Sequence, residues 1–201
     1  YIQKTIEGVS ADAIIGKKEF MGLTLKVNQQ VLIPRPDTET WLEKVIQYYR
    51  NETGLKVADL GTGSGAILVG FLYYCRDAVG VGVDISTEAL KIAEENGQNL
   101  KITDRVEWRQ GDYLKAFDEE DIFDGIFSNP PYIPTMDIGG LSREVKHEPR
   151  LALDGGTDGL YFYHLLAKGA AEHLKPGGFL AVEFGIGQAT EILEMFLKSA
   201  P

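Results

Sequence analysis

The spacing of hydrophobic residues becomes regular after about residue 56, where short apolar runs begin to alternate with longer amphipathic segments. Runs rich in Val, Ile and Phe predict five buried strands, at residues 57–60, 79–83, 106–108, 123–127 and 179–184. Apolar residues three and four positions apart predict helices at residues 64–74, 86–99, 159–174 and 189–198. Strands and helices that alternate at this spacing predict an α/β fold with a doubly wound, mostly parallel sheet.

The first part of the chain shows a different pattern. Residues 14–27 read as two short strands, which predicts a β-hairpin. Two prolines in the following segment exclude regular structure there, and Asp37 or Thr38 is expected to cap the helix that comes next. We therefore predict a hairpin and linker at residues 1–36, followed by an α/β domain at residues 37–201.

Composition narrows the class of ligand. The 201 residues are 44% hydrophobic, which suffices for one domain with a substantial core. The formal net charge is −10, whereas proteins that grip nucleic-acid phosphates usually carry a basic face. The charge therefore weighs against nucleic acid as a substrate and favours a small-molecule cofactor with a basic or neutral protein partner.

The sequence carries no pattern typical of a metal site, an internal disulfide or a membrane-spanning segment. The single cysteine, Cys75, lies in an apolar run and is expected to be a buried core thiol, and the three histidines are scattered without metal-ligand spacing. No apolar run reaches the ~18 residues that a membrane span needs, and no signal peptide opens the chain. We predict no metal, no membrane association and a cytoplasmic location.

Polar residues and glycines follow the first predicted strand. In a parallel sheet the carboxyl ends of the strands bind ligands, and glycines there allow a ligand to touch the backbone. A glycine-rich turn can also be purely structural or belong to a dinucleotide site. The candidate residues at this first turn are Asp59, Gly61, Thr62, Gly63, Ser64 and Gly65.

The second and third predicted strands are also followed by acidic residues. Asp84 can accept both ribose hydroxyls of an adenosine, or it can cap the next helix. Asp112 can accept from an adenine amino group while Tyr113 packs beside the ring, although an aspartate there can also serve a turn. Together, the three strand ends favour an adenosine-containing cofactor. Asp59 would repel a pyrophosphate but suit a cationic methionine group, which favours S-adenosylmethionine over a dinucleotide.

The fourth predicted strand runs into the sequence Asn129, Pro130, Pro131 and Tyr132. The Asn129 side chain and the Pro130 carbonyl can accept the two N–H bonds of a planar –NH₂ group, and Tyr132 can stack over that group. Such a cradle aims the nitrogen at a methyl group and needs no acid–base residue. A Pro-Pro pair after a strand can also be an ordinary chain break. We predict that these four residues form the catalytic and substrate-binding element.

With these motifs, the chain resembles the HemK/PrmC family, the protein-(glutamine-N5) methyltransferases that act on peptide chain release factors. The resemblance covers nearly the whole chain and implies a Rossmann-like class I S-adenosylmethionine-dependent methyltransferase fold. The segment from Ile33 to Glu39 is the most specific part of it, because amino-adenine DNA methyltransferases share the Asn-Pro-Pro-Tyr sequence but not, as a rule, this segment. The matching residues are 33–39, 59–67, Asp84, 128–132, Glu148 with Pro149, and 154–160.

The resemblance implies the glutamine of a release factor's Gly-Gly-Gln motif as the substrate. It further implies that residues 37–201 are the catalytic domain, that residues 1–36 follow a helical domain absent from this sequence, and that two terminal strands are missing after residue 201. Some members have tryptophan at the position of Tyr113. Arg35 and Glu148 are candidates for holding the substrate backbone, or equally for a surface salt bridge.

Two other substrates stay open at this point. A relative that methylates glutamine on a ribosomal protein would share the same amide-binding residues. An amino-adenine nucleic-acid methyltransferase would share Asn129 to Tyr132, but the acidic charge and the missing basic recognition segment count against it.

Overall fold

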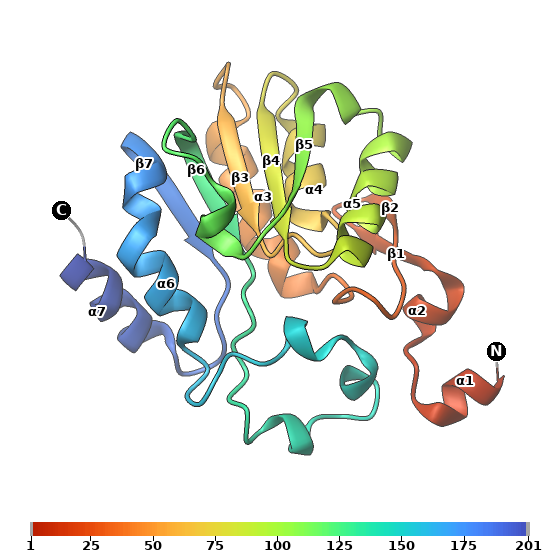
Figure 1. The fold of residues 1–201 in the computed structure, drawn as a ribbon. Helices are drawn as coiled ribbons and strands as arrows, with labels where there is room; N and C mark the ends of the chain where they lie inside the picture. The colour runs from red at the N-terminus through yellow and green to blue at the C-terminus, as the bar shows by residue number, and fades with distance from the viewer. Residues whose placement is uncertain (1, 200–201) are drawn as a thin grey trace.

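The computed structural model describes residues 2–199, and its centre is a five-stranded, fully parallel sheet in the order β5-β4-β3-β6-β7 (Figure 1). The chain order reverses between β3 and β6, so the sheet has a topological switch point at its middle. All five predicted strands are present, and the predicted parallel sheet is confirmed. Their bounds are β3 Lys56–Leu60, β4 Val79–Asp84, β5 Val106–Gln110, β6 Phe123–Ser128 and β7 Leu174–Val182.

Helices cover both faces of the sheet (Figure 1). One face packs against helices whose apolar residues, such as Leu42 and Phe71, form a buried cluster with Phe127 of the sheet. On the other face, Leu166 packs with Val83 and Ile126. The helices are α3 Pro36–Tyr49, α4 Ala66–Tyr74, α5 Thr87–Asn99, α6 Tyr161–Gly169 and α7 Ala189–Ser199. Short 3₁₀ turns are η1 Thr103–Arg105, η2 Tyr113–Ala116, η3 Ile138–Gly140, η4 Val145–His147, η5 Arg150–Ala152 and η6 Ala170–His173.

The starts of two helices test the predicted caps. The α5 cap is confirmed, since Ser86 Oγ accepts from the Ala89 N–H at 3.2 Å. The prediction for α3 is wrong: the helix begins at Pro36, and Arg35 occupies the cap position without a side-chain cap bond. Proline suits the first helical position because its fixed φ is already helical and no N–H is needed there. Thr38 consequently lies inside the first turn, and its hydroxyl is free for another partner.

The N-terminal hairpin packs onto the sheet domain. Strands β1 Lys17–Phe20 and β2 Leu23–Lys26 pair antiparallel, after the short helices α1 Ile2–Glu7 and α2 Ala11–Ile15. Phe20 and Leu25 are buried in the same cluster as the α3 and α4 side chains. The predicted hairpin is therefore present, with strands shortened by α2. The division into domains at residue 36 stays a prediction.

Two further boundaries differ from the sequence prediction. The helix expected over residues 159–174 is the shorter α6 followed by η6, and β7 starts directly after it. The register of β7 against β6 shifts between Phe123 and Gly125, so the Pro-Gly-Gly segment forms a bulge within an edge strand. None of the helices between residues 2 and 199 has the length and apolar character to cross a membrane.

Candidate active site

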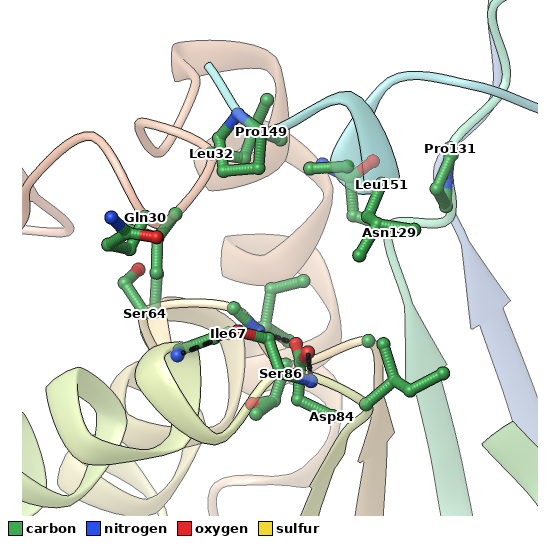
Figure 2. A pocket seen from close by; sticks show the side chains of 18 of the residues that line it. Gln30, Leu32, Ser64, Ile67, Asp84, Ser86, Asn129, Pro131, Pro149 and Leu151 are labelled. Carbon is green, nitrogen blue, oxygen red and sulfur yellow. Dashed lines mark hydrogen bonds between the residues drawn. The ribbon is translucent and has the colours of Figure 1, made fainter. Parts of the chain in front are cut away.

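A pocket of about 280 Å³ opens at the carboxyl ends of the sheet strands. Figure 2 shows Leu32 and Pro149 on one side of it, facing Ser64, Ile67 and Asp84 on the other. The structure thus brings together nine residues predicted from the sequence. They are Gly61, Thr62, Gly63, Ser64, Asp84, Asp112, Tyr113, Asn129 and Pro131.

The turn after β3 forms the floor of the pocket. The N–H groups of Gly61 and Thr62 both donate to the Val83 carbonyl at 2.9 Å, which ties this turn to the end of β4. Gly61, Gly63 and Gly65 have φ values of +72°, +56° and +78°, a conformation that disfavours any residue with a side chain. The floor is therefore backbone, and a ligand can approach it closely.

Asp59 lies beneath this floor and does not line the pocket. It is fully buried, and its Oδ2 accepts a hydrogen bond from Thr62 Oγ1 at 2.6 Å. Its Oδ1 has no hydrogen-bond partner among the described residues. Burial raises the Asp59 pKa to about 7, an effect that the Thr62 hydrogen bond reduces and the nearby Asp84 charge increases. An unpaired carboxylate oxygen at this depth would be stabilised by a cation bound above the turn.

Asp84 ends β4 and faces the pocket. Its Oδ2 accepts from the Gly63 N–H at 2.8 Å and its Oδ1 from the Ser86 N–H at 2.9 Å. Burial raises the Asp84 pKa, and these backbone hydrogen bonds partly offset the rise. A carboxylate oxygen has more than one acceptor direction, so Asp84 can hold the loop and still accept from a pair of hydroxyls.

Tyr113 forms part of the pocket wall beyond β5. Its ring stacks on Phe162 with the ring centroids 4.6 Å apart, and its φ is +53°, which is strained for a residue with a side chain. Its buried hydroxyl also lacks a partner within the described part of the chain. The adjacent Asp112 lines the pocket and accepts from Lys115 Nζ at 2.5 Å. A flat aromatic wall beside an acceptor suits a planar ring that carries an amino group.

The segment that follows β6 also lines the pocket, beside the turn that follows β3. Asn129 and Pro131 line it, whereas Pro130 and Tyr132 lie beside it. Asn129 Nδ2 donates to Thr38 Oγ1 at 3.3 Å. The backbone beyond is held by Gln188, whose Nε2 donates to the Tyr132 carbonyl at 3.1 Å. Burial raises the pKa of Tyr132, so its phenol stays neutral near pH 7.

Two glycines allow another segment to press against this region. Gly155 and Gly159 lie so close to the backbone of Pro131 and Tyr132 that an added Cβ would stand 2.7 Å and 2.3 Å from their carbonyl oxygens. Gly159 also has a φ of +79°. The glycine-rich segment 154–160 is therefore packed directly behind the Asn-Pro-Pro-Tyr sequence, which fixes its backbone.

Arg35 and Glu148 bind each other next to the pocket-lining residues Pro34 and Pro149. Arg35 Nη2 lies 2.7 Å and 2.8 Å from the two carboxylate oxygens of Glu148, whose residue is only 8% exposed. Burial raises the Glu148 pKa, and Arg35 opposes the rise. The pair ties the segment before α3 to the β6–α6 connection. A role of either residue in holding substrate stays a prediction.

The sequence did not single out most of the pocket's upper wall. This wall comes from the linker and first turn of α3, and from the β6–α6 connection and the start of α6. The family resemblance includes residues 33–39 and Glu148 with Pro149, but it assigned none of the lining side chains there to the pocket. They meet only through the folded arrangement of the Arg35–Glu148 pair and the 3₁₀ turns. The unpredicted lining residues include Gln30, Val31, Leu32, Pro34, Thr38, Pro149, Leu151, Ala152 and Phe162. Within residues 2–199, no cluster of His, Cys, Asp and Glu is placed to hold a metal ion.

Known proteins match both the sequence and the fold. A family model described as a methyltransferase domain matches residues 51–186. The release factor glutamine methyltransferase of Bradyrhizobium diazoefficiens is 44% identical, over 100% of this chain and 68% of that protein. The enzyme of the same name from Caulobacter vibrioides is 43% identical, over 98% of this chain and 68% of its own length. A methyltransferase structure from Pyrococcus furiosus has a TM-score of 0.65 at 21% identity, covering 98% of this chain and 87% of that one. The predicted Rossmann-like methyltransferase fold is confirmed.

Proposed function

The chain belongs to the family of release factor glutamine methyltransferases, and from that premise we propose that it methylates the glutamine side chain of a release factor's Gly-Gly-Gln motif. The methyl donor is S-adenosylmethionine, as the methyltransferase domain requires. One observation carries the proposal: Asn129 reaches the pocket directly after β6, whose last residue, Ser128, pairs with Leu60 just before the glycine turn. The methyl donor and the amide that receives the methyl group can therefore meet between Asn129 and the glycine turn.

The cofactor fits the first three strand ends. The glycine turn offers bare backbone, and the unpaired Asp59 oxygen offers negative charge below it, which suits a cationic methionine group. Asp84 would accept the ribose hydroxyls, and Asp112 with Tyr113 would hold the adenine. The pocket volume of about 280 Å³ lies near the lower end of the range for small-molecule sites.

The chemistry left to the protein is mostly positioning. S-adenosylmethionine supplies an electrophilic methyl group. An amide nitrogen is a poor nucleophile because its lone pair is delocalised into the carbonyl. Asn129 and the Pro130 carbonyl would accept both hydrogens of the target amide, hold its nitrogen in line and stabilise the positive charge that develops on it. Tyr132 would pack against the amide plane.

The partner of the reaction is a protein of the translation apparatus, so we place the activity in the cytoplasm. Exposed apolar side chains near the pocket suit a protein substrate. Leu151 lines the pocket and is 69% exposed, and Met136 on the same connection is 85% exposed. A net charge of −10 favours a partner that is basic at the point of contact.

The test supplies labelled S-adenosylmethionine and four possible substrates in parallel. They are a release factor, the same factor with the motif glutamine changed to alanine, a mixture of ribosomal proteins, and DNA. We expect label only in the first arm and, by mass spectrometry, a single methyl group on the motif glutamine. Label in the alanine variant, or in the ribosomal proteins or DNA alone, would contradict the proposed substrate.

A further inference from the structure

Thr38 is a buried polar residue that the proposed reaction does not use. It is 3% exposed and lies in the first turn of α3, with its hydroxyl turned toward the sheet. There it bridges two residues at the ends of adjacent strands. Asn129 Nδ2 donates to Thr38 Oγ1 at 3.3 Å, and Thr38 Oγ1 donates to Glu183 Oε2 at 2.5 Å.

The direction of these two hydrogen bonds follows from the chemistry of the groups. An ionised carboxylate can only accept, and a hydroxyl has one hydrogen to give. Because Thr38 gives that hydrogen to Glu183, its oxygen can only accept from Asn129. The Asn129 amide must therefore turn its NH₂ group toward Thr38. Its Oδ1 is then left as the acceptor on the other side.

Glu183 is fixed in place by contacts of its own. Trp41 Nε1 donates to the same Oε2 atom at 3.1 Å. The Glu183 N–H donates to the Ser128 carbonyl at 3.0 Å, and its own carbonyl accepts from the Tyr163 hydroxyl at 2.7 Å. The Glu183 backbone is thus anchored to β6 and α6, and its carboxylate is held by Trp41 of α3, so it can serve as a fixed reference for the Thr38 hydroxyl.

We propose that Thr38 and Glu183 are positioning residues that hold the Asn129 amide in one orientation, with Oδ1 presented to the target nitrogen. This inference rests on the proposed function, since it assigns a task to residues that hold the Asn129 side chain of the same site. An Asn129 side chain turned the other way would present N–H groups to the N–H groups of the substrate and would suit a carboxylate instead. The hydrogen-bonded series Glu183–Thr38–Asn129, here called the relay, therefore selects a glutamine side chain over a glutamate side chain.

The variants for the test change one hydrogen-bonding group at a time in the full chain. Thr38→Val removes the hydroxyl and keeps the shape, and Thr38→Ser restores the hydroxyl. Glu183→Gln keeps the shape, but its amide can either accept from the Thr38 hydroxyl or donate to it. The hydrogen bonds through Thr38 can then point in either direction. Thr40→Val is the matched control, because the exposed Thr40 hydroxyl only donates to the Pro36 carbonyl of the same helix.

We expect Thr38→Val to lower kcat on the release factor by roughly 10–100-fold, the loss of one hydrogen bond to a charged group. KM for the release factor and the affinity for S-adenosylmethionine should stay near the parent values. Thr38→Ser should recover most of the rate, Glu183→Gln should lose part of it, and Thr40→Val should lose none. In an Asn129→Ala background, Thr38→Val should have no further effect on kcat, because both changes act through one amide.

A second readout does not depend on the substrate. In ¹⁵N-labelled protein with S-adenosylhomocysteine, one Nδ2 proton of Asn129 should exchange slowly with solvent in the parent and Thr38→Ser, and fast in Thr38→Val. Equal kcat values for the parent and Thr38→Val, additive losses with Asn129→Ala, or unchanged exchange would each overturn the relay. If the parent fails to methylate the release factor, the proposed function fails, while the exchange measurement still decides the relay.

Discussion

The two halves of the pocket, which we propose to bind the cofactor and the target amide, are built in different ways. In the cofactor half, the polar contacts are local: Thr62 binds Asp59 three residues away, and the Gly63 N–H binds Asp84 21 residues away, across one β–α–β step. In the target half, Asn129 binds Thr38 across 91 residues, and Thr38 binds Glu183 across 145. The first half is made by the turns of consecutive strands, whereas the second is assembled from three distant parts of the chain.

This difference predicts how substitutions will behave. Changes in the cofactor half should alter ligand affinity and local electrostatics, because its residues act through the turn on which they lie. Changes in the target half should alter the rate of the chemical step, because its residues orient one amide by contacts from elsewhere. Substitutions in the cofactor half should therefore mainly change ligand affinity, and substitutions in the target half should mainly change the rate of the chemical step.

The largest expected effect belongs to Asn129→Ala. Removing a preorganised acceptor should lower the rate of methyl transfer by something like ~10²–10³-fold, with cofactor affinity nearly unchanged. Asn129→Asp keeps an acceptor but adds charge, so we expect an intermediate loss. Single-turnover transfer with saturating cofactor measures this directly. A rate close to that of the parent would show that the Asn129 cradle is not the catalytic element.

The next effect concerns Asp59 and pH. Its folded pKa of about 7 lies above the ordinary value of 3.8, so the folded state holds the proton more tightly than the unfolded state. The contribution to stability is complete below about pH 4 and is lost as the pH rises through 7. Without cofactor, the free energy of unfolding should fall by on the order of 2–4 kcal/mol between pH 5 and pH 8.

Urea denaturation at a series of pH values tests this prediction. Asp59→Asn, which cannot ionise, should remove most of the decline, and the exposed Asp104→Asn should leave it unchanged. Cofactor should also flatten the decline, because its cation would stabilise the charged Asp59. The same pH dependence in the parent and Asp59→Asn would show that another group is responsible.

Asp84→Ala should weaken cofactor binding by about 1–3 kcal/mol, the usual cost of losing hydrogen bonds to a charged group. The affinity should fall while the single-turnover rate at saturating cofactor changes much less, in contrast to Asn129→Ala. Isothermal calorimetry gives the affinity, and Glu88→Ala on the exposed side of α5 is the control. Unchanged affinity in Asp84→Ala would remove Asp84 from the cofactor site.

The smallest effect is expected at the Arg35–Glu148 pair. Arg35→Gln leaves a buried carboxylate unpaired and should cost about 1 kcal/mol of stability, reduced by the partial exposure of Arg35. Adding Glu148→Gln should recover much of this loss. If the pair only joins the two segments, Arg35→Gln and Glu148→Gln should raise KM for the release factor equally. A much larger rise for Arg35→Gln would instead show that Arg35 contacts the substrate.

The sequence by itself determined the parallel sheet, its helices and the residues that line the proposed cofactor half of the pocket. These features follow from local chemistry: apolar periodicity sets the element type, and residues such as Gly61, Gly63 and Asp84 end strands in a parallel sheet, whose carboxyl ends share one edge. The Asn129 to Tyr132 element was visible for the same reason, since it follows a strand directly.

Only the tertiary structure decided which distant residues contact and surround the Asn129 to Tyr132 segment. From the sequence, Thr38 looked like a helix cap, because threonine near a helix start usually serves its own backbone. The fold instead places Pro36 at the first helical position and turns the Thr38 hydroxyl toward Asn129 and Glu183. No periodicity encodes a contact across 145 residues, because its partners are chosen by the packing of α3 against the strand ends. The same packing brings Arg35 to Glu148, next to the pocket-lining residues Pro34 and Pro149.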